Sequence, residues 1–313
     1  MSKTAFVFPG QGSQSLGMLA DLAAAHPLVQ RTFAEASDAL ELDLWTLVQD
    51  GPEDELNRTD LTQPAMLTAG VAVWRVWQDQ GGATPLWMAG HSLGEYTALV
   101  CAEALSFADA VKLVAERGRF MQDAVPTGEG AMAAILGLDD DTVRQVCAAA
   151  ANGEVVDAVN FNAPGQVVIA GGAAAVERAV AAAREAGAKR AVTLPVSVPS
   201  HCELMRPASE RLAERLASVQ IAMPVTPVLH NVDAATAKDP DAIRDRLARQ
   251  LHCPVRWVET VQNLAKNQIG TLIECGPGKV LSGLGKRIDR SLNSLPIVDS
   301  ASLEKALQGA AND

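Results

Sequence analysis

The sequence lacks the features that mark several large classes of protein. It has no run of about 18 consecutive apolar residues, the length that a membrane-spanning helix needs, so we expect no transmembrane segment. The apolar stretch at residues 4–8 is too short for a signal peptide, and we therefore expect a cytoplasmic chain. The five cysteines are odd in number and form no C-x-x-C pair, so neither a disulfide framework nor a metal site is expected.

Positive charge is also scarce. The chain has 26 Lys and Arg against 37 Asp and Glu, for a formal net charge of −11. Nucleic acid and anionic membranes bind to cationic surfaces, so we expect neither as a partner. The charge is uneven, however: residues 1–60 hold 10 acidic and 3 basic side chains, whereas residues 276–290 hold 4 basic and 1 acidic.

The length and the order of the predicted elements indicate two domains. A chain of 313 residues is about twice the length of a typical domain. Residues 128–197 predict a βαββαβ order, that of a ferredoxin-like unit. Its expected elements are a strand at 131–136, a helix at 140–151, strands at 155–159 and 166–170, a helix at 173–186 and a strand at 190–194.

The two flanking segments also alternate strands and helices. The expected strands are 3–8, 86–89, 227–232 and 271–274. The expected helices are 19–25, 28–40, 64–80, 95–103, 106–123, 202–219, 241–250 and 255–265. Because this pattern is that of an α/β domain, we expect residues 1–127 and 198–313 to form one larger α/β domain that carries the ferredoxin-like unit as an insertion.

One motif carries chemistry. Gly90-His91-Ser92-Leu93-Gly94 matches G-x-S-x-G, the turn that exposes a nucleophilic serine between a strand and a helix. The predicted strand at 86–89 and helix at 95–103 supply that context. The backbone N–H of Leu93 would then face an oxyanion. The alternative is an ordinary glycine-rich turn.

A serine nucleophile needs a base, and the sequence alone does not choose one. His91 adjoins Ser92 and should point away from it, and His26 precedes a proline in a segment that is typical of a surface. His201, His230 and His252 stay open as candidates.

Two further features can be explained without a catalytic or nucleotide-binding role. Gly10-Gln11-Gly12 lacks the third glycine of a dinucleotide fingerprint and the lysine of a P-loop, so we reject nucleotide binding and retain only a turn that can donate backbone N–H groups. Arg117 lies in the helix predicted at 106–123, where an arginine is usually solvated. The residues by themselves thus indicate a serine acyltransferase or hydrolase of unknown substrate.

A set of longer motifs adds a resemblance over nearly the whole chain. In order, they are Phe8-Pro9-Gly10-Gln11-Gly12-Ser13-Gln14, Gly90-His91-Ser92-Leu93-Gly94-Glu95, Arg117-Gly118, Asn160-Phe161-Asn162, Pro195-Val196-Ser197-Val198-Pro199-Ser200-His201 and Glu274-Cys275-Gly276-Pro277-Gly278. With them the sequence resembles the malonyl-CoA:acyl-carrier-protein transacylases of bacterial fatty-acid synthesis. That family implies an α/β-hydrolase-like domain with a ferredoxin-like insertion, in agreement with the element order.

The resemblance implies catalytic roles. Ser92 would be the nucleophile and His201 its general base, with the backbone N–H groups of Leu93 and Gln11 as the oxyanion hole. Arg117 would bind the malonyl carboxylate in a bidentate pair.

It also implies the surroundings of these groups. The backbone carbonyl of Gln250 would be the third member of the triad, and Asn162 and Val198 would line the pocket. Malonyl transfer to the phosphopantetheine thiol of acyl carrier protein would proceed by a ping-pong mechanism through a malonyl-serine. Malonyl-CoA and coenzyme A would be substrate and product, with no metal or bound cofactor.

The partner protein bears on the uneven charge. Acyl carrier proteins are typically acidic, so a chain with a charge of −11 should need a basic docking face. We predict that this face flanks the Ser92 cleft, and we expect the enzyme to be a monomer. Its residues would be Lys189, Arg190, Lys279, Lys286, Arg287 and Arg290.

Three other functions compete with this one. A stand-alone polyketide-synthase acyltransferase would use malonyl- or methylmalonyl-CoA. A catalytically idle carrier-docking module would leave Ser92 unlabelled by malonyl-CoA. A plain esterase would need no arginine in its pocket.

Overall fold

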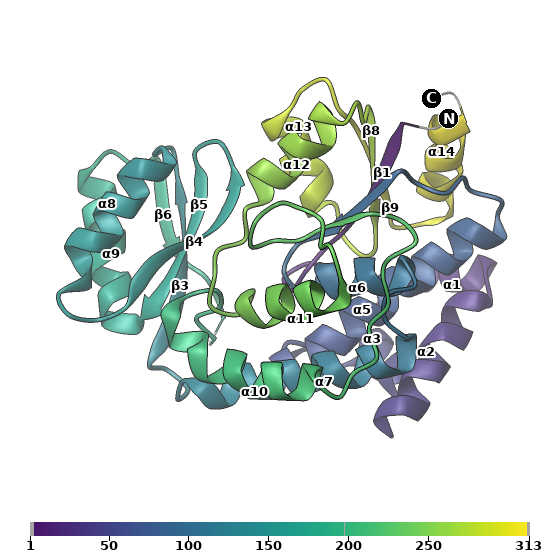
Figure 1. Ribbon diagram of the computed structural model, residues 1–313, viewed down its shortest axis with the longest axis horizontal. Helices are drawn as coiled ribbons and strands as arrows, with labels where there is room; N and C mark the ends of the chain where they lie inside the picture. Colours follow the sequence, from purple (N-terminus) through teal and green to yellow (C-terminus); the bar gives the residue numbers. More distant parts are fainter. Residues whose placement is uncertain (1–2, 197, 312–313) are drawn as a thin grey trace.

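The computed structural model describes residues 3–196 and 198–311, so Ser197 of the quoted motif lies outside the described residues (Figure 1). The fold is α/β, with a five-stranded parallel sheet and a separate four-stranded antiparallel sheet. Among the described residues, no helix combines the length and the hydropathy that a membrane crossing requires.

The parallel sheet has the order β7-β2-β1-β8-β9. Its strands are β1 (Thr4–Phe8), β2 (Trp87–Gly90), β7 (Val228–Leu229), β8 (Thr271–Cys275) and β9 (Asn293–Ile297). β1 is buried along its whole length because helices cover both faces of the sheet. Phe6 and Phe8 point into the larger core cluster, whereas Ala5 and Val7 belong to the cluster on the opposite face.

The helices of this part form two layers. The larger core cluster includes residues of α5, α6 and α7. The cluster on the opposite face includes residues of α12 and α13, which lie to the left of β1 and β8 in Figure 1. The helices are α1 (Ala20–Ala25), α2 (Leu28–Leu40), α3 (Leu44–Asp50), α4 (Glu53–Leu56), α5 (Thr59–Asp79), α6 (Gly94–Cys101), α7 (Phe107–Ala124), α10 (Arg206–Leu216), α11 (Pro240–Arg249), α12 (Trp257–Lys266), α13 (Val280–Ile288) and α14 (Ser300–Ala311), with a 3-10 turn η1 (Glu203–Met205).

The antiparallel sheet lies to the left in Figure 1 and has the order β4-β5-β3-β6. Its elements are β3 (Gly130–Leu136), α8 (Asp140–Ala151), β4 (Val156–Ala163), β5 (Gln166–Gly172), α9 (Ala173–Glu185) and β6 (Arg190–Thr193). The two helices cover one face of the sheet. On the other face, Met132, Val159 and Val168 pack against Cys202 of the neighbouring segment.

One backbone ladder joins β4 to the rest of the molecule. Val255 donates its N–H to the carbonyl of Val159 at 2.8 Å and accepts the N–H of Phe161 at 3.0 Å. β4 is therefore an edge strand of its own sheet that is partly covered by the segment between α11 and α12.

The predicted elements are present, with a few different boundaries. The helix predicted from residue 64 begins five residues earlier, at Thr59, and Pro64 lies inside it, where the missing N–H removes one bond of the helical ladder. The helix predicted at 202–219 is split into η1 and α10. The pattern gives no prediction for α3, α4, α13, β9 and α14.

Candidate active site

Ser92 occupies a strained turn between β2 and α6. Its φ angle is 51°, in the left-handed region that L-residues rarely adopt. A Cβ atom on Gly90 would collide with the backbone of Gly94, and one on Gly94 would collide with the carbonyl of Phe8. Both flanking positions therefore need glycine, as a nucleophile elbow requires and an ordinary turn does not.

His201 is the histidine that reaches this serine. Its Nε2 lies 2.9 Å from the Oγ of Ser92, and its Nδ1 lies 2.7 Å from the backbone oxygen of Gln250. Since a carbonyl can only accept, Nδ1 carries the proton and Nε2 is free to accept the serine proton. The other two candidates lie elsewhere: His230 contacts Glu95, and His252 lines a hollow to which Ser92 does not contribute.

The environment keeps His201 neutral. Burial and the nearby charge of Arg117 lower the pKa of His201 to about 3, although the hydrogen bond to Gln250 opposes the shift. A neutral imidazole with its lone pair on the serine hydroxyl can act as a general base without first losing a proton.

Arg117 is a buried residue of α7 rather than a solvated one. Its side chain is 1% exposed and lies beside the nucleophile, with Nη2 at 3.3 Å from the Oγ of Ser92. Nη1 donates to Oε1 of Gln63 at 2.8 Å, and Nη2 donates to Oε1 of Gln250 at 3.0 Å. Arg117 forms no ion pair with any carboxylate of residues 3–196 and 198–311.

These groups open into a cavity of about 130 Å³. Its lining includes Gln11, Ser92, Leu93, Arg117, Val198 and His201, together with Thr59, His91, Met121, Met132, Asn160, Leu194, Val196 and Ser200.

The two backbone segments that could stabilise an oxyanion meet at this cavity. Leu93 is the first residue before α6, and Gln11 follows β1 in the next loop. A Cβ on Gly10 would clash with the carbonyl of His91, so the glycine lets the Gln11 loop approach the nucleophile turn closely.

Asn162 is not among the lining residues, contrary to the sequence-based expectation. Its Oδ1 lies 2.8 Å from Nε2 of His91, so its amide contacts the neighbour of the nucleophile instead. The residue of β4 that lines the cavity is Asn160. In a regular strand Asn160 and Asn162 would lie on the same face, but the register of β4 shifts between Phe161 and Ala163, so the two side chains have different surroundings.

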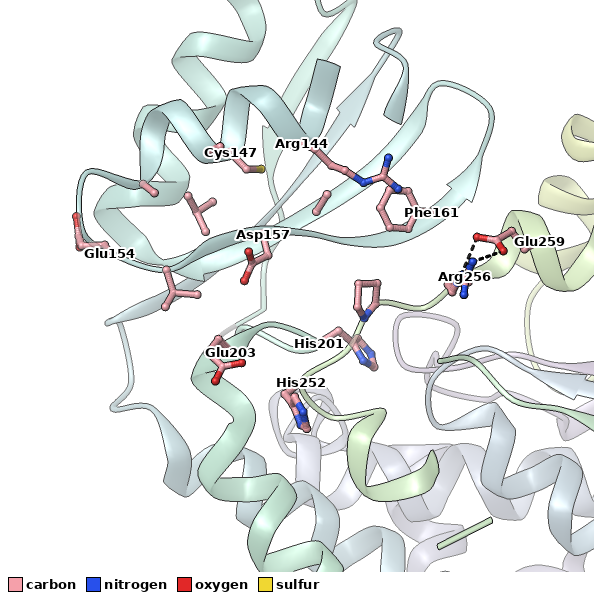
Figure 2. Close-up of a pocket in the computed structure, with 16 residues that line it drawn as sticks. Arg144, Cys147, Glu154, Asp157, Phe161, His201, Glu203, His252, Arg256 and Glu259 are labelled. Carbon is pink, nitrogen blue, oxygen red and sulfur yellow. Dashed lines mark hydrogen bonds and ion pairs between the residues drawn. The ribbon is translucent and has the colours of Figure 1, made fainter. Parts of the chain in front are cut away.

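A larger hollow of about 810 Å³ also reaches His201 (Figure 2). It lies between α8 and β4 on one side and the segments of His201 and His252 on the other. An ion pair of Arg256 with Glu259 stands at one end. Neither Ser92 nor Arg117 lines this hollow, so the smaller cavity is the one that combines nucleophile, base and cation.

A buried polar network lies beneath Ser92 and was not predicted from the sequence. Glu95 accepts from Nδ1 of His230 at 2.7 Å, from the backbone N–H of Asn231 at 2.8 Å and from Nε2 of Gln250 at 2.8 Å. Asn231 in turn accepts the N–H of Ser92 at 2.7 Å. The one signal was an acidic residue in a helix that is otherwise nearly all apolar, directly after the nucleophile motif.

The predicted docking residues are all exposed, and two of them, Arg287 and Lys189, lie near one turn. Arg287 of α13 donates to the side chain of Gln166, which starts β5. The preceding Gly165 accepts the N–H of Gly137, and Lys189 donates its N–H to Leu136. The remaining members are Arg190 on β6, Lys279 and Lys286 at the two ends of α13, and Arg290 just beyond α13.

Known proteins resemble the chain over nearly its full length. A family model described as an acyl transferase domain matches residues 5–303. The malonyl CoA-acyl carrier protein transacylase of Escherichia coli (strain K12) is 58% identical over 308 residues, which cover 98% of this chain and 100% of the relative.

Solved structures agree with that match. An acyl carrier protein S-malonyltransferase from Vibrio cholerae has a TM-score of 0.95 at 57% identity and covers 97% of this chain and 100% of its own. A malonyl-transacylase in complex with its type II PKS acyl-carrier protein has a TM-score of 0.97 at 56% identity and covers 98% and 100%.

Proposed function

The chain belongs to the acyl transferase family and, within it, to the malonyl-CoA:acyl-carrier-protein transacylases, and from that premise we propose how its own residues perform the transfer. The enzyme is an acyltransferase of fatty-acid synthesis. It moves the malonyl group from malonyl-CoA to the phosphopantetheine thiol of acyl carrier protein by a ping-pong mechanism through a malonyl-serine.

Ser92, His201 and the backbone carbonyl of Gln250 would act together as a catalytic triad. The Oγ of Ser92 attacks the thioester carbonyl while Nε2 of His201 takes its proton, and the Nδ1–H bond to the Gln250 carbonyl stabilises the imidazolium that results. The thioester C–S bond breaks, and the coenzyme A thiolate leaves with the proton from His201. In the second half, the carrier thiol gives its proton to His201 and attacks the malonyl ester, and Ser92 recovers its proton.

The backbone N–H groups of Leu93 and Gln11 would bind the oxyanion of each tetrahedral intermediate. Both residues line the cavity beside Ser92. Removing one such donor in other serine enzymes costs about 2.7–4 kcal/mol of transition-state stabilisation.

Arg117 would hold the malonyl carboxylate through a bidentate pair. The observation that carries the proposed function is this one: a guanidinium that is 1% exposed, has no carboxylate partner among the described residues and lies 3.3 Å from the nucleophile of a Ser–His pair. An acetyl group would leave that charge unpaired, which is costly in a buried site. Val198 lines the same cavity, and Asn162 would act through His91.

The finer description of the fold and setting is also part of the proposal. Residues 128–197 would form a ferredoxin-like domain inserted into an α/β-hydrolase-like domain of residues 1–127 and 198–313. The strand order β4-β5-β3-β6 with its two helices on one face supports the ferredoxin-like assignment. The enzyme would act as a cytoplasmic monomer. It would need no metal or bound cofactor, because its own side chains supply each proton and charge that the transfer needs.

The basic residues near the β4–β5 turn and on α13 would dock the carrier. Docking would be transient and electrostatic, and it would weaken as salt screens the charges. The residues are Lys189, Arg190, Lys279, Lys286, Arg287 and Arg290.

Intact-protein mass spectrometry tests the mechanism. After incubation with malonyl-CoA and removal of excess substrate, the wild type should carry one malonyl group and Ser92→Ala none. An unmodified wild type would refute the malonyl-serine at this site. Competition between malonyl-CoA and methylmalonyl-CoA in the same assay tests the polyketide alternative, which predicts labelling by both.

A further inference from the structure

The charge of Arg117 is balanced in an unusual way. A buried guanidinium is normally paired with a carboxylate, because an isolated buried charge is costly. Here the side-chain oxygens that accept its Nη hydrogens belong to neutral groups, Gln63, Gln250 and Ser92, and its Nε has no partner within the described chain. The cation is thus held in place but is left available.

Gln250 connects Arg117 to a carboxylate one step away. Its Oε1 accepts from Arg117 at 3.0 Å and its Nε2 donates to Oε2 of Glu95 at 2.8 Å. The chemistry fixes this orientation of the amide, because a flip would set its NH₂ against the guanidinium and its oxygen against the carboxylate. Gln250 therefore separates the two charges and joins them through one polar chain.

Glu95 is suited to the role of a distant counter-charge. It is fully buried, and its two oxygens receive three N–H groups, from His230, Asn231 and Gln250. Burial lowers the pKa of Arg117, while Tyr96 and Glu95 oppose that shift. The carboxylate thus favours the charged guanidinium without touching it.

We infer that Glu95 is a positioning residue for malonyl selectivity: through Gln250 it balances Arg117 at a distance, so that the first carboxylate to contact the guanidinium is that of the substrate. The inference rests on the proposed function, in which Arg117 binds the malonyl carboxylate. A carboxylate at position 250 would instead pair with Arg117 directly and would repel the incoming malonyl group.

The inference predicts that moving the negative charge from position 95 to position 250 changes the substrate preference. A purely structural role of Glu95 predicts no such change. In Glu95→Gln, Gln250→Glu, the amide at 95 can donate to the carboxylate at 250, so one link between the two positions is kept while the negative charge moves next to Arg117. The Asn231 N–H and the Ser92 carbonyl each lose their present side-chain partner, so we expect this double variant to have a lower thermal midpoint than the wild type, as Glu95→Gln does. Its ratio of kcat/KM for enzyme acylation by malonyl-CoA to that by acetyl-CoA should fall at least about tenfold, mainly through a higher KM for malonyl-CoA.

Single variants keep the inference testable if the double variant is unstable. Glu95→Asp retains the charge and Glu95→Gln removes it, and both disturb the packing. We expect the malonyl-to-acetyl ratio to fall further in Glu95→Gln than in Glu95→Asp. Glu274→Gln is the matched control: Glu274 is a fully buried carboxylate that accepts the N–H groups of Leu281 and Ser282 at the start of α13, away from the cavity. It should lower stability and leave the ratio unchanged.

The outcomes separate the inference from the proposed function. A double variant that keeps the wild-type ratio would show that Glu95 is only structural, and equal ratios in Glu95→Asp and Glu95→Gln would do the same. If the wild type forms no malonyl-serine at all, the proposed function itself fails. If the wild type is malonylated and the ratios do not move, the role of Glu95 alone is wrong.

Discussion

Replacing Arg117 with methionine should invert the substrate preference of the enzyme. Methionine is apolar and of similar length, so it fills the space of the side chain without its charge. The wild-type guanidinium is 1% exposed, and the malonyl carboxylate would pair with its charge. Acylation by acetyl-CoA should be retained or rise by up to about tenfold, because the acetyl group no longer faces an unpaired buried charge.

The expected loss for malonyl-CoA follows from the hydrogen bonds that disappear. Two hydrogen bonds between charged groups contribute about 1.5–3 kcal/mol each, so kcat/KM for malonyl-CoA should fall by about 10² to 10⁴. Gln63 and Gln250 also lose the donor that their Oε1 atoms accept from, which should lower the thermal midpoint as well.

The assay is the rate of enzyme acylation by each thioester, followed by intact mass, with thermal unfolding measured in parallel. Arg117→Lys is the control, since it keeps a positive charge but not the planar fork, and it should lose less malonyl activity than Arg117→Met. A methionine variant that retains malonyl kcat/KM within threefold of wild type would refute the assignment of Arg117, and an esterase-like site would then fit better.

Three further predictions concern the base, the nucleophile turn and the docking face. Because the pKa of His201 is lowered from 6.5 to about 3, kcat/KM for acylation should not decrease as the pH falls through 6.5. The free energy of unfolding should decrease below pH 6.5, because there the unfolded chain binds a proton at this histidine and the folded chain does not. Gly94→Ala should reduce acylation at least about 100-fold, because its Cβ meets a backbone carbonyl of β1, whereas Gly283→Ala, with nothing within 4 Å, should be neutral. Reversing the charges of Lys286 and Arg287 should raise KM for the carrier in a salt-dependent manner and leave acylation by malonyl-CoA unchanged; an unaltered KM would remove these residues from the docking face.

Local signals in the sequence account for the elements and for the nucleophile. The glycines two positions before and after Ser92 have no room for a side chain, and the strand before the motif and the helix after it are both apolar. The motif and its setting could therefore be predicted from the sequence. The small sheet is readable because its strands and helices change periodicity in a fixed order. α13 follows a loop without a side-chain cap, so periodicity alone did not predict it. α14 does have a start signal, since Asp299 accepts the N–H of Ser302, and the sequence-based prediction missed it.

The partners of the nucleophile could not be found in this way. His201 lies 109 residues from Ser92, and Gln250 lies 158 residues from it, so only the fold brings them together. A backbone carbonyl leaves no trace in the identity of its side chain, and the role of Gln250 was therefore available only through the family resemblance. Glu95 and Asn231 have the same difficulty: each is an ordinary polar residue until the structure places it beneath the active site.

The ladder between β4 and Val255 has a mechanical consequence. Val255 lies five residues after Gln250, and His201 donates its backbone N–H to Leu251 in the same segment at 2.9 Å. β4 also contacts the nucleophile turn through Asn162 and His91. The small sheet is thus fastened by hydrogen bonds both to the segment that positions the base and to the neighbour of the nucleophile, so the two sheets together set the distance between the reacting atoms.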